Sequence, residues 1–139
     1  MSRETPTLHP QLASDTHRLG ATAIAQILLH RNAAVPWLIL VPDTERCDFL
    51  ELPAALRTAL LEDCECLGRY LRTRRGAEKI NFAAIGNLVP QLHLHVVGRR
   101  RDDACWPLPV WGNLTVAAAY SDAEVTEYRD DVMAALGGR

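Results

Sequence analysis

Short apolar runs bounded by turn residues recur along this chain, and runs of this kind are typical of β-strands. They lie at residues 18–23, 24–30, 37–41, 79–85 and 89–98. The first two runs are close enough in sequence to form a hairpin. The last two are joined by a short connection that contains glycine, which favours antiparallel pairing.

Between the third and fourth runs the spacing of apolar residues changes to three and four, the period of an amphipathic helix. This pattern predicts one long helix over residues 48–74, with Pro53 in its first turn and Gly76 beyond its end. A capping box at residues 121–124 predicts a last helix that ends near Leu136.

Together these elements predict an α+β fold: a mostly antiparallel five-stranded sheet, with one long helix across it and an extra C-terminal helix. We expect a single domain over residues 1–139, in which residues 1–16 are irregular or briefly helical. The core of this domain is expected at about residues 18–112, and a C-terminal helical extension at about residues 113–139.

The composition is that of an ordinary globular protein, with 48% hydrophobic and 23% charged residues. A net charge of -2 weighs against the broad positive surface that grips nucleic acid, so we expect no nucleic-acid partner. The run Arg99, Arg100 and Arg101 is a local exception, which we expect to be solvated.

The first residues contain no apolar segment like that of a signal peptide, and no apolar run approaches the roughly 18 residues of a membrane span. We therefore expect a cytoplasmic protein without a membrane partner. The four cysteines lack the CxxC spacing of zinc and redox sites, so we expect free thiols and no metal bound by them.

The strand at 89–98 carries the candidate chemistry. Successive side chains of a strand point to opposite faces, so Gln91, His93 and His95 share one face and the leucines and valine between them share the other. The apolar face is expected to bury on a core and the polar face to be open. Imidazole titrates near neutral pH, so it can act as a nucleophile, a general acid or base, or a metal ligand.

Three interpretations of this face are open. The histidines can be satisfied polar residues of a half-exposed strand. They can bind a metal, but a catalytic zinc needs three protein ligands and the other histidines are scattered. Lastly, one imidazole can attack phosphorus while its neighbour donates a hydrogen bond to the phosphate, and the backbone N–H groups of Gly86 and Asn87 can share the charge.

Residues 91–97, Gln-Leu-His-Leu-His-Val-Val, resemble the signature of the histidine-triad (HIT) superfamily, in which three histidines alternate with apolar residues. Here Gln91 replaces the first histidine. Residues 37–42 resemble the family's nucleotide-site strand that ends in proline, and residues 106–109 resemble its Trp-Pro-Pro-Gly tail. The resemblance extends over about residues 18–112.

The resemblance implies a nucleotide hydrolase or transferase that acts on nucleoside phosphoramidates or dinucleoside polyphosphates. His93 would be the nucleophile that forms a nucleotidyl-histidine intermediate, His95 would bind the phosphate oxygens, and Gln91 would orient the network. The residues expected to bind substrate are Asn81, Gly86, Asn87 and Asn32. The family further implies a purine nucleotide ligand, no required metal or cofactor, and a homodimer formed through the long helix and the penultimate strand.

Two departures from the family pattern support an alternative function. Gln91 cannot titrate near neutral pH. Leu88 occupies a position where a hydroxyl residue often assists the leaving group. The alternative is therefore a nucleotide-binding module with little or no turnover. The final helix lies beyond the family's core, and we expect it to pack over the site or on a partner subunit.

Overall fold

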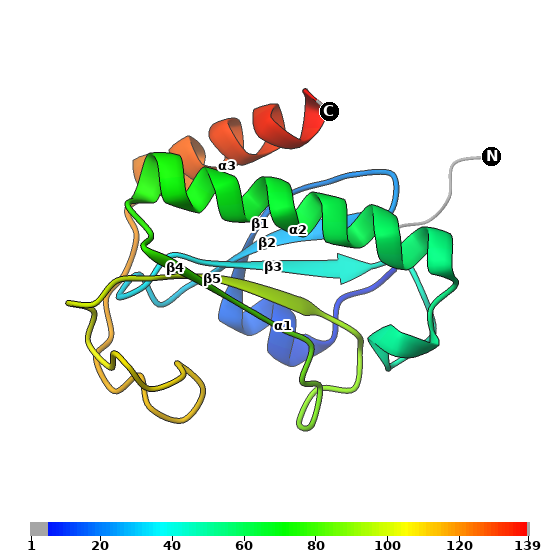
Figure 1. The fold of residues 1–139 in the computed structure, drawn as a ribbon, viewed down its shortest axis with the longest axis horizontal. Helices are drawn as coiled ribbons and strands as arrows, with labels where there is room; N and C mark the ends of the chain where they lie inside the picture. Colours follow the sequence, from blue (N-terminus) through cyan, green and yellow to red (C-terminus); the bar gives the residue numbers. More distant parts are fainter. Residues whose placement is uncertain (1–5, 139) are drawn as a thin grey trace.

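The computed structural model describes residues 6–138, and its centre is a five-stranded antiparallel sheet (Figure 1). The strand order is β1-β2-β3-β5-β4, so β1 and β4 are the edges. The strand bounds are β1 (Thr16–Ala21), β2 (Ala25–His30), β3 (Trp37–Pro42), β4 (Lys79–Ala83) and β5 (Leu94–Arg99). The predicted α+β architecture is confirmed, including the antiparallel pairing of β4 with β5.

The long helix α2 (Ala54–Arg75) lies across one face of the sheet, with α3 (Asp122–Gly137) alongside it (Figure 1). The single helix predicted over residues 48–74 is wrong at its start. Residues 49–51 form a separate short 3-10 helix, η1 (Phe49–Glu51), and α2 begins after it at Ala54. Pro53 has an extended ψ of 142° and caps α2 from outside, where its missing N–H costs nothing. Gly76 ends α2 in the left-handed conformation, at φ 70°.

The predicted capping box at the start of α3 is present. The Ser121 hydroxyl accepts a hydrogen bond from the Glu124 backbone N–H at 3.2 Å, and the Ser121 N–H donates to the Glu124 carboxylate at 3.0 Å. Tyr128 and Val132 on α3 are buried in the core under α2. The last helix therefore belongs to the main hydrophobic core, and the expectation that it packs over the site is wrong, because no α3 residue lines the cavity beside His93 and His95. No helix among residues 6–138 combines the length and the apolar content needed to cross a membrane.

Both faces of the sheet are covered, which differs from the expected open face. Alternate side chains of β2, β3 and β5 pack under α2 and α3, among them Ile27, Leu38 and Leu94. On the other face Ile39 and Val97 pack against a second cluster, made by the first helix α1 (Pro10–Asp15) and the segment 105–110. The central strands are apolar on both faces, so the sheet buries both.

Strand β5 begins at Leu94 and not at residue 89 as predicted. Residues 84–93 form an irregular connection instead, because Pro90 has no N–H for a strand ladder and the Gln91 carbonyl bonds to a side chain. The alternation of faces nevertheless extends to Leu92, which lies in the core under α2, while His93 lies on the opposite side.

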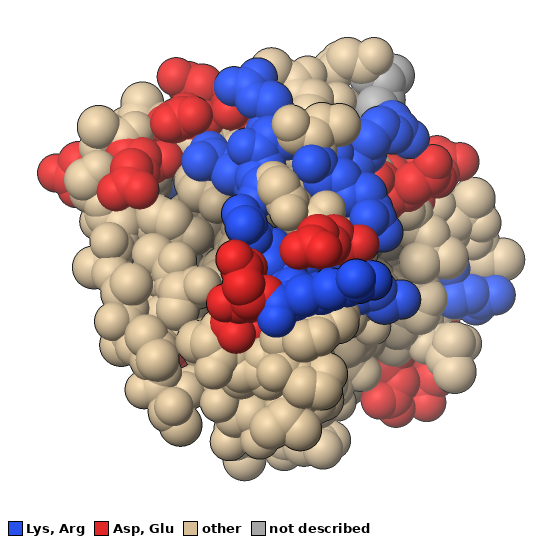
Figure 2. Space-filling model, turned by 60° about the vertical axis from the view of Figure 1, so that its left-hand side comes forward, with Lys and Arg blue, Asp and Glu red and all other residues tan. Residues whose placement is uncertain are grey.

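The arginine run is only partly solvated, so the expectation for it is wrong at its first member. Figure 2 shows basic side chains interleaved with acidic ones on the end of the molecule where α2 ends, and Arg100 pairs with Asp102 there at 3.0 Å. Arg99, in contrast, is 1% exposed and forms an ion pair with Asp103 at 2.7 Å. This arginine is part of the interior.

Candidate active site

A cavity of about 480 Å³ lies against the sheet face that α1 partly covers. Its walls come from α1, from the ends of β2, β3 and β5, and from the connection that leads into β5. His93 and His95 both line it, as the strand alternation predicted. Their rings lie 4.8 Å apart between centroids, and the residues are 8% and 5% exposed. His93 also lines a second cavity of about 390 Å³, on the side of Phe49 and Glu51, whereas His95 lines only the first of these two.

His93 is held with one ring nitrogen available. Its Nδ1 lies 2.7 Å from the backbone carbonyl oxygen of Gln91. A carbonyl oxygen only accepts, so Nδ1 carries the hydrogen and donates it. In the neutral ring Nε2 then keeps a lone pair, which is the form that a nucleophile or a general base needs.

His95 is held in the opposite tautomer. The indole Nε1 of Trp37 lies 3.0 Å from His95 Nδ1, and an indole nitrogen only donates. His95 Nδ1 is therefore the acceptor and Nε2 carries the hydrogen. Burial, with smaller effects of His93 and His30, lowers the pKa of His95 to about 3, so the ring is neutral at physiological pH. The site thus places an N–H donor on one ring beside an unprotonated nitrogen on the other.

His30, Trp37 and Trp111 complete the aromatic wall. Trp37 lies on the strand that the resemblance placed at the nucleotide site, whereas sequence reasoning missed His30 and Trp111 as cavity residues. His30 stacks on Trp37 with centroids 4.1 Å apart, and its Nδ1 accepts the backbone N–H of Asn32 at 3.1 Å. Trp111 meets His95 edge to face at 5.1 Å. The antiparallel pairing of β2 with β3 was the available signal for His30, because it brings His30 at the end of β2 beside Trp37 at the start of β3.

Two of the predicted substrate-binding residues, Gly86 and Asn87, line the cavity. Gly86 has a φ of 66°, a conformation that favours glycine, and it turns the chain at the cavity wall. Leu88, at the rim, is 95% exposed. An apolar side chain therefore stands at the position where the family resemblance implies a hydroxyl residue.

The other two predicted substrate-binding residues lie outside the cavity lining. Asn81 accepts a hydrogen bond from Arg99 Nη1 at 3.0 Å. Asn32 donates to the Val116 carbonyl at 2.9 Å and accepts the Ala118 N–H at 3.1 Å, which ties down the segment before α3. Their contacts with substrate stay predictions.

Within residues 6–138, no group of three or more His, Cys, Asp or Glu side chains is arranged to hold a metal ion. All four cysteines are free thiols. The two imidazoles at the cavity are instead oriented by a carbonyl group and an indole.

Comparison with known proteins gives one family. The profile of the HIT domain matches residues 11–102. Histidine triad proteins of known structure from Bradyrhizobium japonicum, Sinorhizobium meliloti and Marinobacter aquaeolei are 34%, 35% and 35% identical to this chain, with TM-scores of 0.84, 0.85 and 0.86. The matches cover 92%, 92% and 95% of this chain and 96%, 95% and 96% of those chains. Curated protein sequences gave no significant match.

Proposed function

Because the chain belongs to the HIT domain family, we propose that it is a nucleotide hydrolase or transferase that works through a nucleotidyl-histidine intermediate. Its proposed substrates are nucleoside phosphoramidates or dinucleoside polyphosphates. The observation that carries the proposal is the 2.7 Å contact between His93 Nδ1 and the Gln91 carbonyl, because it leaves His93 Nε2 unprotonated inside a cavity.

In the first step the Nε2 lone pair of His93 attacks the phosphorus next to the nucleoside. A P–N bond to His93 forms, while the bond from phosphorus to the leaving group breaks and its electron pair departs with that group, which takes a proton from water. The ring becomes cationic, and its Nδ1–H donates to the Gln91 carbonyl throughout. His95 Nε2–H is available to a phosphate oxygen, where a fixed donor stabilises developing charge.

In the second step water attacks the same phosphorus, the P–N bond breaks, and its electron pair returns to His93 Nε2. The products are a nucleoside monophosphate and the neutral ring, and the water proton leaves to solvent. No residue of the site changes its tautomer over the cycle. The proposed roles of His93, His95 and the Gln91 backbone thus close a complete turnover.

The nucleoside is proposed to occupy the cavity of about 480 Å³, with a purine as its base. Aromatic and apolar side chains such as Trp37, Ile39 and Trp111 line it, and such surfaces accept planar rings. Gly86 and Asn87 are proposed to approach the phosphate. Asn81 and Asn32 lie outside the cavity lining, and their contacts with substrate are proposed from the family resemblance alone.

A second candidate function is nucleotide binding with little turnover. Leu88 favours it, because this exposed rim residue brings no hydroxyl to a leaving group. Gln91 favours it as well, because a carboxamide cannot exchange a proton near neutral pH. The two candidates bind the same ligand. They differ in whether a bond between His93 and phosphorus forms and is then hydrolysed.

Turnover of adenosine 5′-phosphoramidate separates the candidates. We expect release of AMP, a transient intact-protein mass increase of one adenylyl group, and no loss of rate in a chelator. AMP binding by calorimetry without release or adduct would support the binding module. Absence of both binding and turnover would contradict the proposed function and its alternative together.

We further propose that the chain forms a homodimer through α2 and β4. Strand β4 is an edge strand, and Phe82 on it is 44% exposed. Beside it lies a mainly apolar groove lined by Leu61 and Gly68 of α2 and by Ile80 of β4. An uncovered edge with apolar neighbours is a surface that proteins usually cover.

Light scattering at several concentrations is expected to give the mass of two chains. Phe82→Glu should shift the protein toward monomer, because it buries a charge between the subunits. Leu108→Glu is the matched control, since Leu108 is also exposed but lies outside the groove, and it should leave the mass unchanged. A wild-type protein that stays monomeric at every concentration would refute the dimer.

A further inference from the structure

The side chain of Gln91 points to the N-terminal segment and bonds to it twice. Its Oε1 accepts the backbone N–H of His9 at 2.7 Å, and its Nε2 donates to the Thr7 carbonyl at 3.1 Å. The N–H of His9 requires an acceptor and the carbonyl of Thr7 requires a donor, so the two contacts together define the orientation of the amide. The carbonyl oxygen and one N–H of a primary carboxamide point the same way, so this one side chain bonds to residues two apart in the N-terminal segment.

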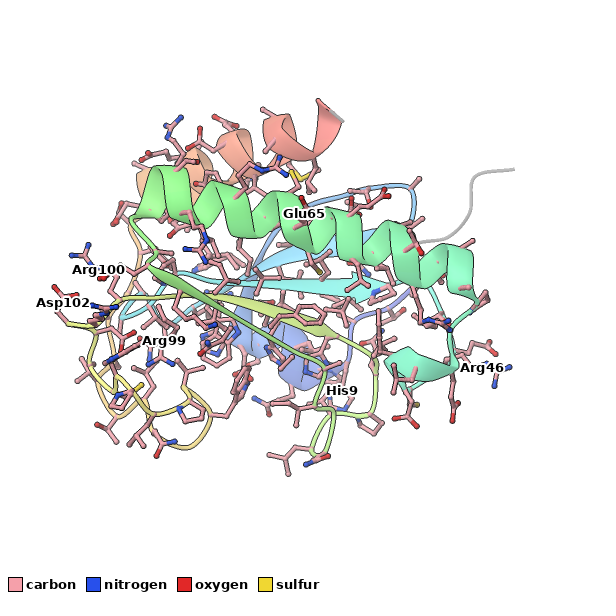
Figure 3. All side chains as sticks on the ribbon, in the orientation of Figure 1. His9, Arg46, Glu65, Arg99, Arg100 and Asp102 are labelled. Carbon is pink, nitrogen blue, oxygen red and sulfur yellow. The ribbon has the colours of Figure 1, made fainter. Side chains whose placement is uncertain are left out.

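This pairing holds the entrance to α1. His9 is the residue before the helix, and Figure 3 shows it on the side of the sheet opposite α2. Helix α1 has only six residues, too few to be stable without tertiary contacts. Its C-terminal end is held by hydrogen bonds from Arg31 to the Asp15 and Ser14 carbonyls and from the Thr16 hydroxyl to the Leu12 carbonyl. Leu12 is buried in the second core, and the Gln91 pairing holds the N-terminal end.

The anchored helix forms one wall of the candidate nucleotide cavity. Gln11, Leu12 and Asp15 line it, on the side facing His30 and Trp37. Gln11 donates to both carboxylate oxygens of Asp15 at 2.9 Å, so the wall presents polar groups as well as Leu12. Without α1 the cavity would be open along this side, and a nucleoside would lose the contacts made there.

We propose that Gln91 is a positioning residue that latches α1 over the nucleotide cavity, and that this latch sets the affinity for the nucleotide and not the rate of phosphoryl chemistry. This inference rests on the proposed function for its ligand. It separates the two parts of residue 91: the backbone carbonyl orients His93, and the side chain holds the cavity wall.

The latch also accounts for glutamine at a position where the family has histidine. A carboxamide offers its donor and its acceptor side by side at the end of one flexible chain. A neutral imidazole also has one donor and one acceptor, but they lie on separate ring positions that point apart. Histidine at position 91 therefore cannot make both contacts with Thr7 and His9, and Gln91→His should release α1 even though it restores the triad.

The test compares Gln91→Ala, Gln91→His and the isosteric Gln91→Glu, which keeps an acceptor for His9 but places a carboxylate against the Thr7 carbonyl. Hydrogen exchange of the amides of residues 9 and 11–15 is measured first, without nucleotide. We expect about tenfold faster exchange in Gln91→Ala and Gln91→His, because two hydrogen bonds are lost, and a smaller change in Gln91→Glu. Exchange as slow as in the wild type in Gln91→His would overturn the latch.

Steady-state kinetics on adenosine 5′-phosphoramidate then separate positioning from chemistry. We expect a KM about tenfold higher in Gln91→Ala, with kcat within about twofold of the wild type. A kcat that falls while KM stays constant would overturn the inference, because the side chain would then act on the reaction itself. The exchange measurement needs no ligand, so it decides the latch even if the wild type proves inactive, and that inactivity would count only against the proposed function.

Discussion

His93→Ala is expected to abolish nucleotidyl transfer and to leave the fold intact. The substitution removes the one ring nitrogen at the cavity that has a lone pair available, so the rate should fall on the order of 10³-fold or more. The side chain makes a single hydrogen bond, to a neighbouring backbone group, and its loss costs about 1 kcal/mol of folding free energy. AMP release measures the loss of turnover, intact-protein mass measures the loss of the adenylyl adduct, and circular dichroism measures whether the fold is retained.

His17→Ala is the matched control for this substitution. His17 lies on β1, outside the cavity lining, so turnover and the adenylyl adduct should both persist. An adduct that still forms on His93→Ala, at any other residue, would refute the assignment of the nucleophile. Loss of the circular dichroism signal in His93→Ala would instead make His93 a structural residue. The folded His93→Gln variant would then be compared with the wild type for nucleotide binding and turnover.

Asp103→Ala is expected to destabilise the protein by about 3–5 kcal/mol, the largest effect on folding that we predict. Asp103 is 5% exposed, accepts hydrogen bonds from Arg99 Nε and Nη2 at 2.7 and 3.0 Å, and also accepts the backbone N–H groups of Cys105 and Trp106. Its removal leaves the buried guanidinium without a counter-charge. Urea unfolding at neutral pH measures the change.

Asp102→Ala is the neighbouring control. Asp102 pairs with Arg100 at the surface, and Figure 3 shows both at the end of the molecule that also holds Arg99. Exposed pairs contribute about 0–1 kcal/mol, so this variant should unfold almost as the wild type does. Equal destabilisation by the two substitutions would show that burial of the Arg99–Asp103 pair is not what matters.

The same ion pair has a defined pH dependence. Hydrogen bonds from Arg99, opposed by burial, lower the pKa of Asp103 below its ordinary value. A carboxyl group whose pKa is lower in the folded state contributes its full stability above the unfolded pKa, near 4, and loses it as the pH falls through the folded pKa. The wild type should therefore lose this contribution only in acid, and the gap between wild type and Asp103→Ala should narrow there.

Local signals in the sequence were sufficient for most of the fold. The three-and-four spacing identified α2, the capping box identified α3, and alternation placed His93 and His95 on one face. Each of these signals acts within a few residues of the element that it predicts. Strand β5 starts later than predicted because Pro90 has no N–H for a strand ladder. Helix α2 starts after Pro53, whose extended ψ of 142° keeps it outside the predicted first turn.

The remaining features depend on residues far apart in the chain. Trp37 meets His95 only through the β3–β5 pairing, and Gln91 meets His9 only once the N-terminal segment lies against the connection before β5. The burial of Arg99 likewise depends on an irregular loop that returns Asp103 to it. Periodicity along the sequence does not contain this information, so the hydrogen-bond partners of the two imidazoles and of the Gln91 side chain could not be predicted from it.

The proton positions at the two catalytic candidates are set entirely by uncharged groups. A main-chain carbonyl orients His93 and an indole orients His95, and neither gains or loses a proton in water at ordinary pH. Added salt screens charges but leaves such short neutral contacts nearly untouched. The tautomers of His93 and His95 should therefore not change with ionic strength, including when a cell concentrates or dilutes its electrolytes.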